Sequence, residues 1–117
     1  NWAWWDGDLL RETFKGDDNR WGANSSSNGK SLSIIKWKGE SLTEGIGGDI
    51  LMIADLYGDW REEIITALPG EIRIYTTNIP AKDRRVTLMQ DAIYRNYVAH
   101  RSMGYPQAPV PSYYLGE

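Results

Sequence analysis

The 117-residue sequence contains no cysteine, which excludes a disulfide scaffold, a cysteine-ligated metal site and a thiol nucleophile. No apolar run approaches the roughly 20 residues that a membrane-spanning helix requires, so no membrane partner is predicted. Basic residues are also scarce, because 13 Lys and Arg face 16 Asp and Glu and leave a net charge of −3. This balance argues against a nucleic-acid partner, which requires a basic surface.

Aromatic residues with a polar group are abundant, since the chain has six Trp and seven Tyr but a single Phe. Such residues occur both in the cores of β proteins and where sugar rings stack on a surface. The 12 Gly and 5 Pro favour strands and turns over long helices. At this length the chain is at most one domain. The first five residues show no signal peptide, so we expect a removed leader or a start within a larger protein.

Three apolar segments predict an antiparallel meander from Ile50 to Thr77. Residues 50–54 are a continuous apolar run of strand length, as in a strand buried on both faces, and residues 63–68 predict a second apolar strand. Pro69-Gly70 is a strong turn signal, and residues 71–77 alternate as a third strand does. A further strand is predicted at residues 32–37.

The remaining segments carry weaker signals. Residues 24–30, rich in Ser, Asn and Gly, predict a surface loop. Residues 82–101 predict a short helix or an irregular segment. The proline-rich tail, residues 105–111, is expected to be extended and poorly paired, and residues 112–115 predict a closing strand.

One turn motif occurs twice. Residues 6–12 and 57–63 share the pattern Gly-Asp-x-x-x-Glu at an offset of 51 residues. A period near 50 residues that is filled with short strands and turns is typical of propeller blades, and each blade needs neighbours to bury its faces. The sequence therefore predicts an all-β fold of antiparallel propeller blades, about two in number and incomplete on its own.

Both copies of the motif place three carboxylates around a turn that contains glycine. Calcium takes about six to eight oxygen ligands in flexible geometry, and a glycine lets the chain bend so that these oxygens converge. The alternative is an ordinary solvated turn whose acids pair with arginine. The predicted calcium ligands are Asp55, Asp59 and Glu63 in the second copy, with a thinner set of Asp6, Asp8 and Glu12 in the first.

Basic side chains gather in residues 82–101, although the whole chain is acidic. A local basic field favours an anionic ligand; the alternative is a solvated surface with pairs such as Asp91 and Arg95 at i, i+4. Tyr105 is either a platform for a sugar or a ring packed under the proline-rich tail, and a lone His100 is more often structural than catalytic. The basic residues are Lys82, Arg84, Arg85, Arg95, His100 and Arg101.

Five motifs occur in an order that resembles the family 11 polysaccharide lyases, the rhamnogalacturonan lyases. The resemblance covers residues 4–116 apart from the Ser/Asn-rich loop. It implies the C-terminal last quarter or so of an eight-bladed, calcium-containing β-propeller. One departure is Gln90, where the family motif carries histidine. The motifs are Trp4–Glu12, Ala54–Glu63, Ile72–Thr77, Thr87–Arg95 and Gly104–Pro109.

The resemblance implies a parent enzyme that cleaves rhamnose–galacturonate polysaccharide of plant cell walls by β-elimination, in a secreted or periplasmic location. It implies Arg84, Arg85 and Arg95 as carboxylate partners, Tyr105 as a substrate contact, and His100 or Tyr105 in proton transfer, with no general base assigned. We expect this chain alone to be inactive. Two alternatives are a non-catalytic calcium-dependent carbohydrate-binding module and a structural element that completes a propeller with the rest of the chain or with further copies.

Overall fold

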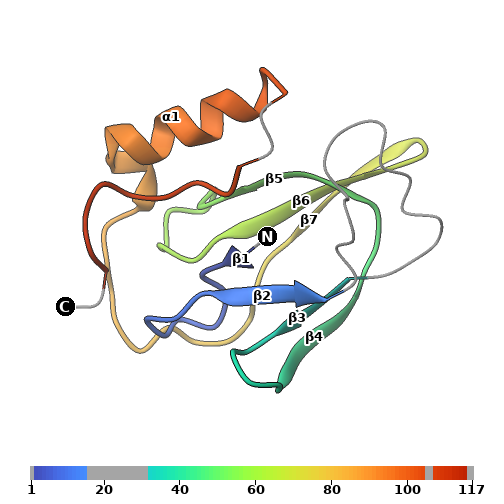
Figure 1. Ribbon diagram of the computed structural model, residues 1–117, viewed down its shortest axis with the longest axis horizontal. Helices are drawn as coiled ribbons and strands as arrows, with labels where there is room; N and C mark the ends of the chain where they lie inside the picture. The colour runs from blue at the N-terminus through green and yellow to red at the C-terminus, as the bar shows by residue number, and fades with distance from the viewer. Residues whose placement is uncertain (1, 16–31, 105–106, 116–117) are drawn as a thin grey trace.

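A computed structural model describes residues 2–15, 32–104 and 107–115. Within these residues the chain is mostly β, with two antiparallel sheets, one short α-helix and one 3₁₀ turn (Figure 1). The prediction of a β fold built from antiparallel sheets is therefore confirmed, and the helix lies in residues 82–101, where a short helix or an irregular segment is predicted. The loop predicted at residues 24–30 lies outside the described residues. The elements are β1 (Trp2–Ala3), β2 (Glu12–Lys15), β3 (Leu32–Ile35), β4 (Ser41–Ile46), β5 (Asp49–Ala54), β6 (Glu63–Leu68), β7 (Glu71–Tyr75), η1 (Leu88–Gln90) and α1 (Ala92–Arg101).

The first sheet has the order β1-β2-β3-β4, and each pair of neighbours is antiparallel. Residues alternate across β3, so Leu32 and Ile34 are buried while their neighbours are half-exposed. A tight turn joins β3 to β4, in which the Lys36 amide donates to the Glu40 carbonyl at 2.8 Å. The predicted strand at residues 32–37 is confirmed as β3, which ends two residues earlier.

The second sheet is the predicted meander, β5-β6-β7. β5 and β6 pair through Ile53 and Ile64, and Leu68 pairs with Glu71 where the chain turns into β7. Gly70 in that turn has φ +77°, a conformation that L-residues rarely adopt. The apolar runs and the turn signal therefore confirm this part of the fold. The structure shows two sheets, and the propeller stays a prediction.

Two apolar clusters form the core. The first lies between the inner faces of the two sheets, and the second lies under η1, α1 and the C-terminal segment. Trp5 belongs to the first cluster and Trp4 to the second, because successive side chains point in opposite directions along an extended chain. The first cluster contains Ala3, Trp5, Leu32, Ile34, Ile46, Ile50, Ile53 and Ile64, and the second contains Trp4, Trp60, Leu88, Tyr94 and Leu115.

Helix α1 lies along β5, with the C-terminal segment beside it (Figure 1). Asp91 caps the helix by accepting from the Tyr94 amide at 3.1 Å, and it also accepts from the Ser112 amide at 2.7 Å. His100 and Arg101 occupy the last turn, where cations favour the helix dipole. Within the described ranges, no helix is long and apolar enough to cross a membrane.

The predicted closing strand at residues 112–115 is absent from the described structure, which assigns no strand there. Pro109 and Pro111 lack the amide donor that a strand ladder needs. The Ser112 amide and hydroxyl both donate to the Asp91 carboxylate instead. This segment is therefore held by a helix cap rather than by a sheet.

Candidate functional site

The two copies of the repeated motif fold into turns of the same form. Gly7 and Gly58 both have positive φ, at +83° and +78°. The following aspartate accepts from the amide two residues later in each copy: Asp8 Oδ1 from Leu10 at 2.7 Å, and Asp59 Oδ1 from Arg61 at 3.2 Å. The sequence repeat is thus also a structural repeat.

The motif glutamates close both turns in the same way. Glu12 Oε2 accepts from the Trp5 amide at 2.8 Å, and Glu63 Oε2 accepts from the Leu56 amide at 2.8 Å, seven residues upstream in each case. Both glutamate residues are 1% exposed. Each motif therefore ends in a buried carboxylate that holds the start of its own turn.

The first turn brings its three acids together. One carboxylate oxygen from each of Asp6, Asp8 and Glu12 lies within 4.8 Å of the others. Lys36 Nζ lies 2.6 Å from Asp6 and 2.9 Å from Asp8. These two hydrogen bonds raise the pKa of Lys36 above its ordinary value. The lysine thus supplies positive charge to two of the three carboxylates.

Glu12 has an unusual proton affinity. Burial, with a smaller contribution from the nearby charges of Asp6 and Asp8, raises the pKa of its carboxyl from 4.5 to about 7, against the opposing amide hydrogen bonds. A cation bound at this cluster would offset the cost of burying the Glu12 charge and the repulsion from Asp6 and Asp8. The donor set of three carboxylates is one that a hard cation such as calcium accepts.

The second turn uses its carboxylates differently. Asp55 Oδ2 accepts from the Trp60 amide at 3.1 Å, the Thr87 hydroxyl at 2.8 Å and the Leu88 amide at 2.9 Å. Asp55 Oδ1 accepts from the Gly58 amide at 2.9 Å. Asp55 therefore organises the turn and the start of η1 through four donors of the chain itself.

The other two acids of the second turn also have partners in the chain. Glu63 accepts from the Tyr57 amide at 3.2 Å and from the Thr76 hydroxyl at 3.1 Å, in addition to Leu56. Burial raises the pKa of Glu63. Asp59 pairs with Arg61. Among the described residues, only the acids of the first turn form a three-carboxylate cluster.

A buried glutamate links the two turns. Glu62 Oε2 accepts from the Trp4 amide at 3.0 Å, and Glu62 Oε1 accepts from the Tyr94 hydroxyl at 2.7 Å. The Asp55 amide donates to the same hydroxyl oxygen at 2.9 Å. Burial raises the pKa of Glu62 to about 7, although the charge of Arg11 and these hydrogen bonds oppose the shift.

Arginines lie over two tryptophans. The guanidinium carbon of Arg11 is 3.8 Å from the centre of the Trp4 ring, and that of Arg85 is 5.4 Å from the centre of the Trp60 ring. Arg11 also donates to the Pro109 carbonyl at 2.7 Å. Arg85, a predicted substrate contact, is half-buried, whereas Arg84 beside it is exposed.

The other predicted substrate and catalytic residues lie on α1 or beyond it. Arg95 donates through Nη1 to the carbonyls of Met89, at 2.9 Å, and Gln90, at 3.1 Å. His100 is exposed, and its ring meets Tyr97 edge-on with centroids 6.5 Å apart. Tyr105 lies outside the described residues.

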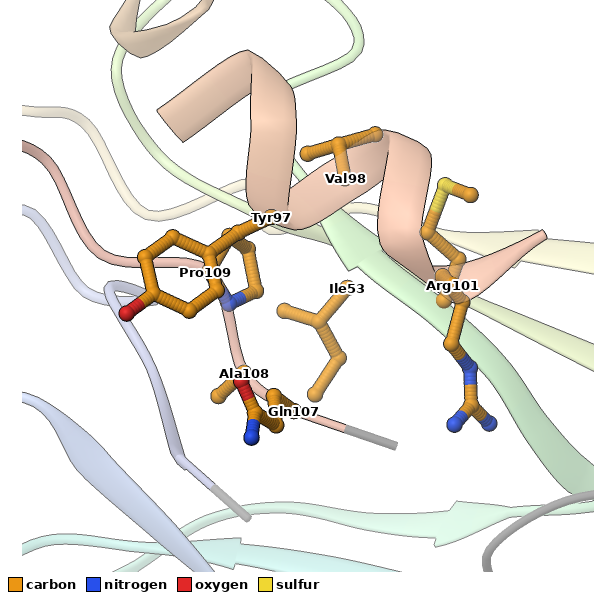
Figure 2. Close-up of a pocket in the computed structure, with 8 residues that line it drawn as sticks. Ile53, Tyr97, Val98, Arg101, Gln107, Ala108 and Pro109 are labelled. Carbon is orange, nitrogen blue, oxygen red and sulfur yellow. The ribbon is translucent and has the colours of Figure 1, made fainter. Parts of the chain in front are cut away.

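A shallow depression lies between α1 and the C-terminal segment (Figure 2). Figure 2 shows Tyr97, Val98 and Arg101 reaching it from the helix, with Gln107 to Pro109 opposite. It is mostly apolar, and the predicted site residues that the structure describes do not line it. The lining residues are Met52, Ile53, Tyr97, Val98, Arg101, Gln107, Ala108 and Pro109.

Sequence reasoning missed Glu62, Tyr94 and the partnership of Lys36 with the first turn. A signal for Glu62 was available in the repeat. Arg11 and Glu62 occupy equivalent positions, 51 residues apart, and carry opposite charges. Such a pair at corresponding positions of adjacent units predicts an attraction between them, and the structure brings them close enough to interact.

A family model described as rhamnogalacturonan lyase family 11, C-terminal domain, matches residues 1–117. The chain belongs to this family, as the resemblance predicted. Two proteins of Bacillus subtilis (strain 168) are similar to it. The rhamnogalacturonan endolyase YesW is 41% identical over 116 residues, which cover 97% of this chain and 18% of that protein. The rhamnogalacturonan exolyase YesX is 37% identical over 124 residues, which cover 97% and 20%.

Two solved structures share the fold. The crystal structure of the lyase YesW matches with a TM-score of 0.64 at 35% identity, covering 98% of this chain and 20% of that one. The Bacillus licheniformis rhamnogalacturonan lyase PL11 matches with a TM-score of 0.65 at 35% identity, covering 99% and 20%. The chain therefore spans about one fifth of the length of these relatives.

Proposed function

We propose that this chain is the C-terminal part of a lyase that cleaves rhamnogalacturonan by β-elimination. The observation that carries the proposal is the match of nearly the whole chain to two relatives named as rhamnogalacturonan lyases. In this reaction a base removes the C5 proton of galacturonate, and the electrons of that C–H bond form the C4–C5 double bond. The C4–O4 bond breaks, and O4 leaves with its electron pair and takes up a proton.

The basic segment supports a role in binding the substrate. Galacturonate carries a carboxylate, which a guanidinium group recognises through paired hydrogen bonds. Arg84 is exposed before η1, and Arg95 is exposed on α1 with part of its guanidinium held by two carbonyls. We assign these two, with Arg85, to carboxylate binding, and keep Tyr105 as a predicted sugar contact and His100 as a predicted proton-transfer group.

We propose that the chain alone does not catalyse the reaction. A general base must come within about 3 Å of the proton that it removes. Glu12, Glu62 and Glu63 are each 1% exposed, and a donor of the chain binds at least one carboxylate oxygen of each. These buried carboxylates stabilise the fold, so we assign the general base of the reaction to the part of the lyase outside these 117 residues.

We further propose calcium as a ligand of this domain. The cluster of Asp6, Asp8 and Glu12 fits a hard cation, because its three carboxylates are close and Glu12 is short of positive charge. A cation there competes with Lys36 for two of the acids. When bound, calcium would offer positive charge to the acids and to an anionic ligand. At the second turn calcium stays a prediction, with weaker support, because chain donors already surround Asp55 and Glu63.

The same proposal includes where the enzyme acts in or outside the cell and how the rest of the propeller is completed. A polymeric plant cell-wall substrate implies a secreted or periplasmic enzyme. The two sheets pack around one shared core, as neighbouring blades of a propeller would. The rest of that ring would come from the longer chain.

One observation favours a second function, a non-catalytic carbohydrate-binding module. Trp37 is 72% exposed on the tight turn between β3 and β4, between Lys36 and Lys38. An exposed indole on a short turn suits stacking on a sugar ring, and a lysine beside it suits a uronate. In this alternative the chain binds the polysaccharide without cleaving it.

A single assay separates these functions. Rhamnogalacturonan is incubated with the chain alone, and with a chimera in which the chain replaces the matching C-terminal segment of the Bacillus subtilis endolyase. The ultraviolet absorbance of the new C4–C5 double bond reports cleavage. We expect a signal from the chimera and none from the chain alone.

The controls make each outcome decisive. The natural endolyase confirms the substrate, and a Trp37→Ala chain tests the binding function by affinity electrophoresis in the polysaccharide. Robust cleavage by the chain alone overturns its proposed inactivity. A folded chimera without cleavage, together with polysaccharide binding that Trp37→Ala abolishes, favours the module instead.

A further inference from the structure

Trp60 has a strained backbone conformation within the second turn. Its φ is +66°, and Lys38 is the only other non-glycine residue with positive φ in the part of the chain that the structure describes. This conformation is unfavourable for a bulky side chain. Trp60 is nevertheless 1% exposed, and its amide donates to Asp55 Oδ2 at 3.1 Å. The surrounding structure therefore enforces the strain.

The turn motif itself does not require this strain. Leu9 occupies the position of Trp60 in the first turn, because the two copies are offset by 51 residues. The two turns have the same form, yet Leu9 does not have positive φ and is 44% exposed. Backbone strain persists where surrounding contacts hold it, and it concentrates at functional sites. The contacts of the Trp60 side chain therefore bear on its role.

The Trp60 side chain is attached to the basic segment before η1. Its Nε1 donates to the Asp83 carbonyl at 2.9 Å, and the Arg85 guanidinium carbon lies 5.4 Å from the ring centre. The Asp83 carbonyl and the Arg84 amide belong to one planar peptide unit. The bond from Trp60 thus fixes the peptide plane from which Arg84 extends.

This segment has no regular structure of its own, because the described residues 76–87 include no helix or strand. At its end the Thr87 hydroxyl and the Leu88 amide both donate to Asp55 Oδ2, which also accepts from the Trp60 amide. We call residues 83–88 the basic loop. One end of this loop is bound by the Trp60 side chain, and the other by the carboxylate that holds the Trp60 backbone.

Arg84 is the arginine of the basic loop that is presented to solvent. It is exposed, whereas Arg85 is half-buried over the Trp60 ring. Residues 82–85 carry three basic side chains and one acidic one, so the local charge is positive despite Asp83. A planar guanidinium binds a carboxylate through paired hydrogen bonds, which demand a defined direction of approach.

We propose that Trp60 is a positioning residue that holds Arg84 in place to bind a galacturonate carboxylate of the polysaccharide. This inference rests on the proposed function, which assigns Arg84 to carboxylate binding. Trp60 acts through the Asp83 peptide and does not touch the substrate. When the basic loop leaves its ordered arrangement, the apparent affinity for substrate falls with the fraction of molecules that remain competent.

Trp60→Phe and Trp4→Phe form a matched pair of variants. Both tryptophans belong to the second core cluster, and an arginine lies over each ring. Trp4 Nε1 is buried without a hydrogen-bond partner among the described residues, whereas Trp60 Nε1 binds the Asp83 carbonyl. Both changes remove the same volume from the cluster, but only Trp60→Phe releases the basic loop.

Steady-state kinetics of the endolyase chimera on rhamnogalacturonan test the proposal. We expect Trp60→Phe to raise KM about five- to tenfold with kcat within about twofold, because lost ordering weakens the binding of substrate and transition state equally. Trp4→Phe should leave both constants within about twofold of the parent. Equal KM values in the two variants, or a fall in kcat alone, overturn the proposal.

Arg84→Ala shows whether Trp60 acts through Arg84. This variant should raise KM by itself, and adding Trp60→Phe to it should raise KM by less than about twofold more, because the two residues contribute to one effect. A rise as large as in the parent background overturns the proposal, since Trp60 would then act without Arg84.

A measurement on the isolated chain does not depend on cleavage. A nitroxide attached to Arg84→Cys is the only label, because the chain has no cysteine of its own. Its electron paramagnetic resonance spectrum should report faster motion after Trp60→Phe but not after Trp4→Phe. Unchanged motion in Trp60→Phe overturns the proposal.

Cleavage by the unsubstituted chimera is judged separately. If it cleaves, equal KM values in the two phenylalanine variants refute the role of Trp60 and leave the proposed function intact. A chimera that does not cleave counts against the proposed function, and affinity electrophoresis of the isolated chain in rhamnogalacturonan then decides. Retardation that Trp60→Phe and Arg84→Ala both reduce supports the role of Trp60, and equal migration of all variants overturns it.

Discussion

Trp4 and Glu62 are joined by two hydrogen bonds in opposite directions. The Trp4 amide donates to Glu62 Oε2 at 3.0 Å, and the Glu62 amide donates to the Trp4 carbonyl at 2.8 Å. The two residues are 58 positions apart in the sequence. This pair connects the entry to the first turn with the end of the second turn, and Tyr94 connects both to α1 through the other Glu62 oxygen.

Replacing Glu62 is expected to change how stability depends on pH. The pKa of Glu62 is raised by burial from 4.5 to about 7 in the folded chain. The folded state therefore binds more protons than the unfolded state between these values, and stability falls as the pH rises through this window. Full titration of one such group corresponds to on the order of 3 kcal/mol.

Urea denaturation across this pH range, without calcium, checks the effect. Glu62→Gln removes this titration and should reduce the loss of stability only in part, because Glu12 and Glu63 also have raised pKa values and still titrate. Glu62→Ala should destabilise the chain at every pH, because it leaves the Trp4 amide and the Tyr94 hydroxyl without their partner. An unchanged pH dependence in Glu62→Gln would show that this carboxyl does not titrate in the window.

Calcium is expected to stabilise the chain through the first turn. Excess calcium should raise the thermal unfolding midpoint relative to a chelator, with a gain of about 2.7 kcal/mol when free calcium is about 100 times its dissociation constant. Asp8→Asn should abolish the rise, whereas Asp59→Asn, the equivalent change in the second turn, should keep it. The reverse result would assign calcium to the second turn.

Lys36 offers a second test of the same cluster. Lys36→Met removes the ammonium group that pairs with Asp6 and Asp8. The variant should be less stable than the parent in chelator, because Asp6 and Asp8 lose their counter-charge, yet it should bind calcium more tightly. Isothermal titration measures the affinity, and a weaker calcium affinity in the variant would refute competition between the two cations.

The two turn glycines at positions 7 and 70 should differ in their tolerance of alanine. Both have positive φ, so either substitution strains the backbone, at a cost of about 1 kcal/mol. A Cβ at Gly70 meets nothing within 4 Å, whereas a Cβ at Gly7 lies 2.9 Å from the Ala81 Cα. Gly7→Ala should therefore cost roughly 3 kcal/mol in urea denaturation. Equal losses would show that the segment at Ala81 yields freely.

Asp91 should hold the C-terminal segment as well as α1. Asp91→Ala removes the helix cap and both bonds to Ser112, so the unfolding midpoint should fall by several degrees and proteolysis should begin within residues 107–115. Ser112→Ala removes one of these bonds and leaves the cap, which makes it the matched control. Cleavage that begins elsewhere in both variants would contradict this role.

The sequence predicts well those parts of the fold that depend on local patterns. The meander of β5 to β7 follows from apolar runs bounded by Pro69-Gly70, which the structure confirms. β4 was missed because it is polar and largely exposed, and β1 because it has only two residues. The strand predicted at residues 112–115 was wrong because the Ser112 amide and hydroxyl bind Asp91, the residue that caps α1, which lies 21 positions away.

The sequence predicts the acidic residues of the candidate site but not the residues that bind them. Asp6, Asp8 and Glu12 lie within one short turn, so their proximity follows from local spacing. Lys36 reaches it from the turn between β3 and β4, so no local pattern could indicate the pairing. The four donors on Asp55 likewise include Thr87 and Leu88, which are more than 30 positions away.

The attachment of Arg101 to β5 makes the two edges of the second sheet different. Its bonds to the Ile50 and Leu51 carbonyls occupy acceptors that an added strand would need, so one margin of the sheet is sealed by a side chain. At the opposite margin, β7 is the last strand of the described sheet. A further strand can therefore add to this sheet only at β7. Association of copies through the second sheet should use that edge, and a lysine or proline introduced into β7 should prevent it.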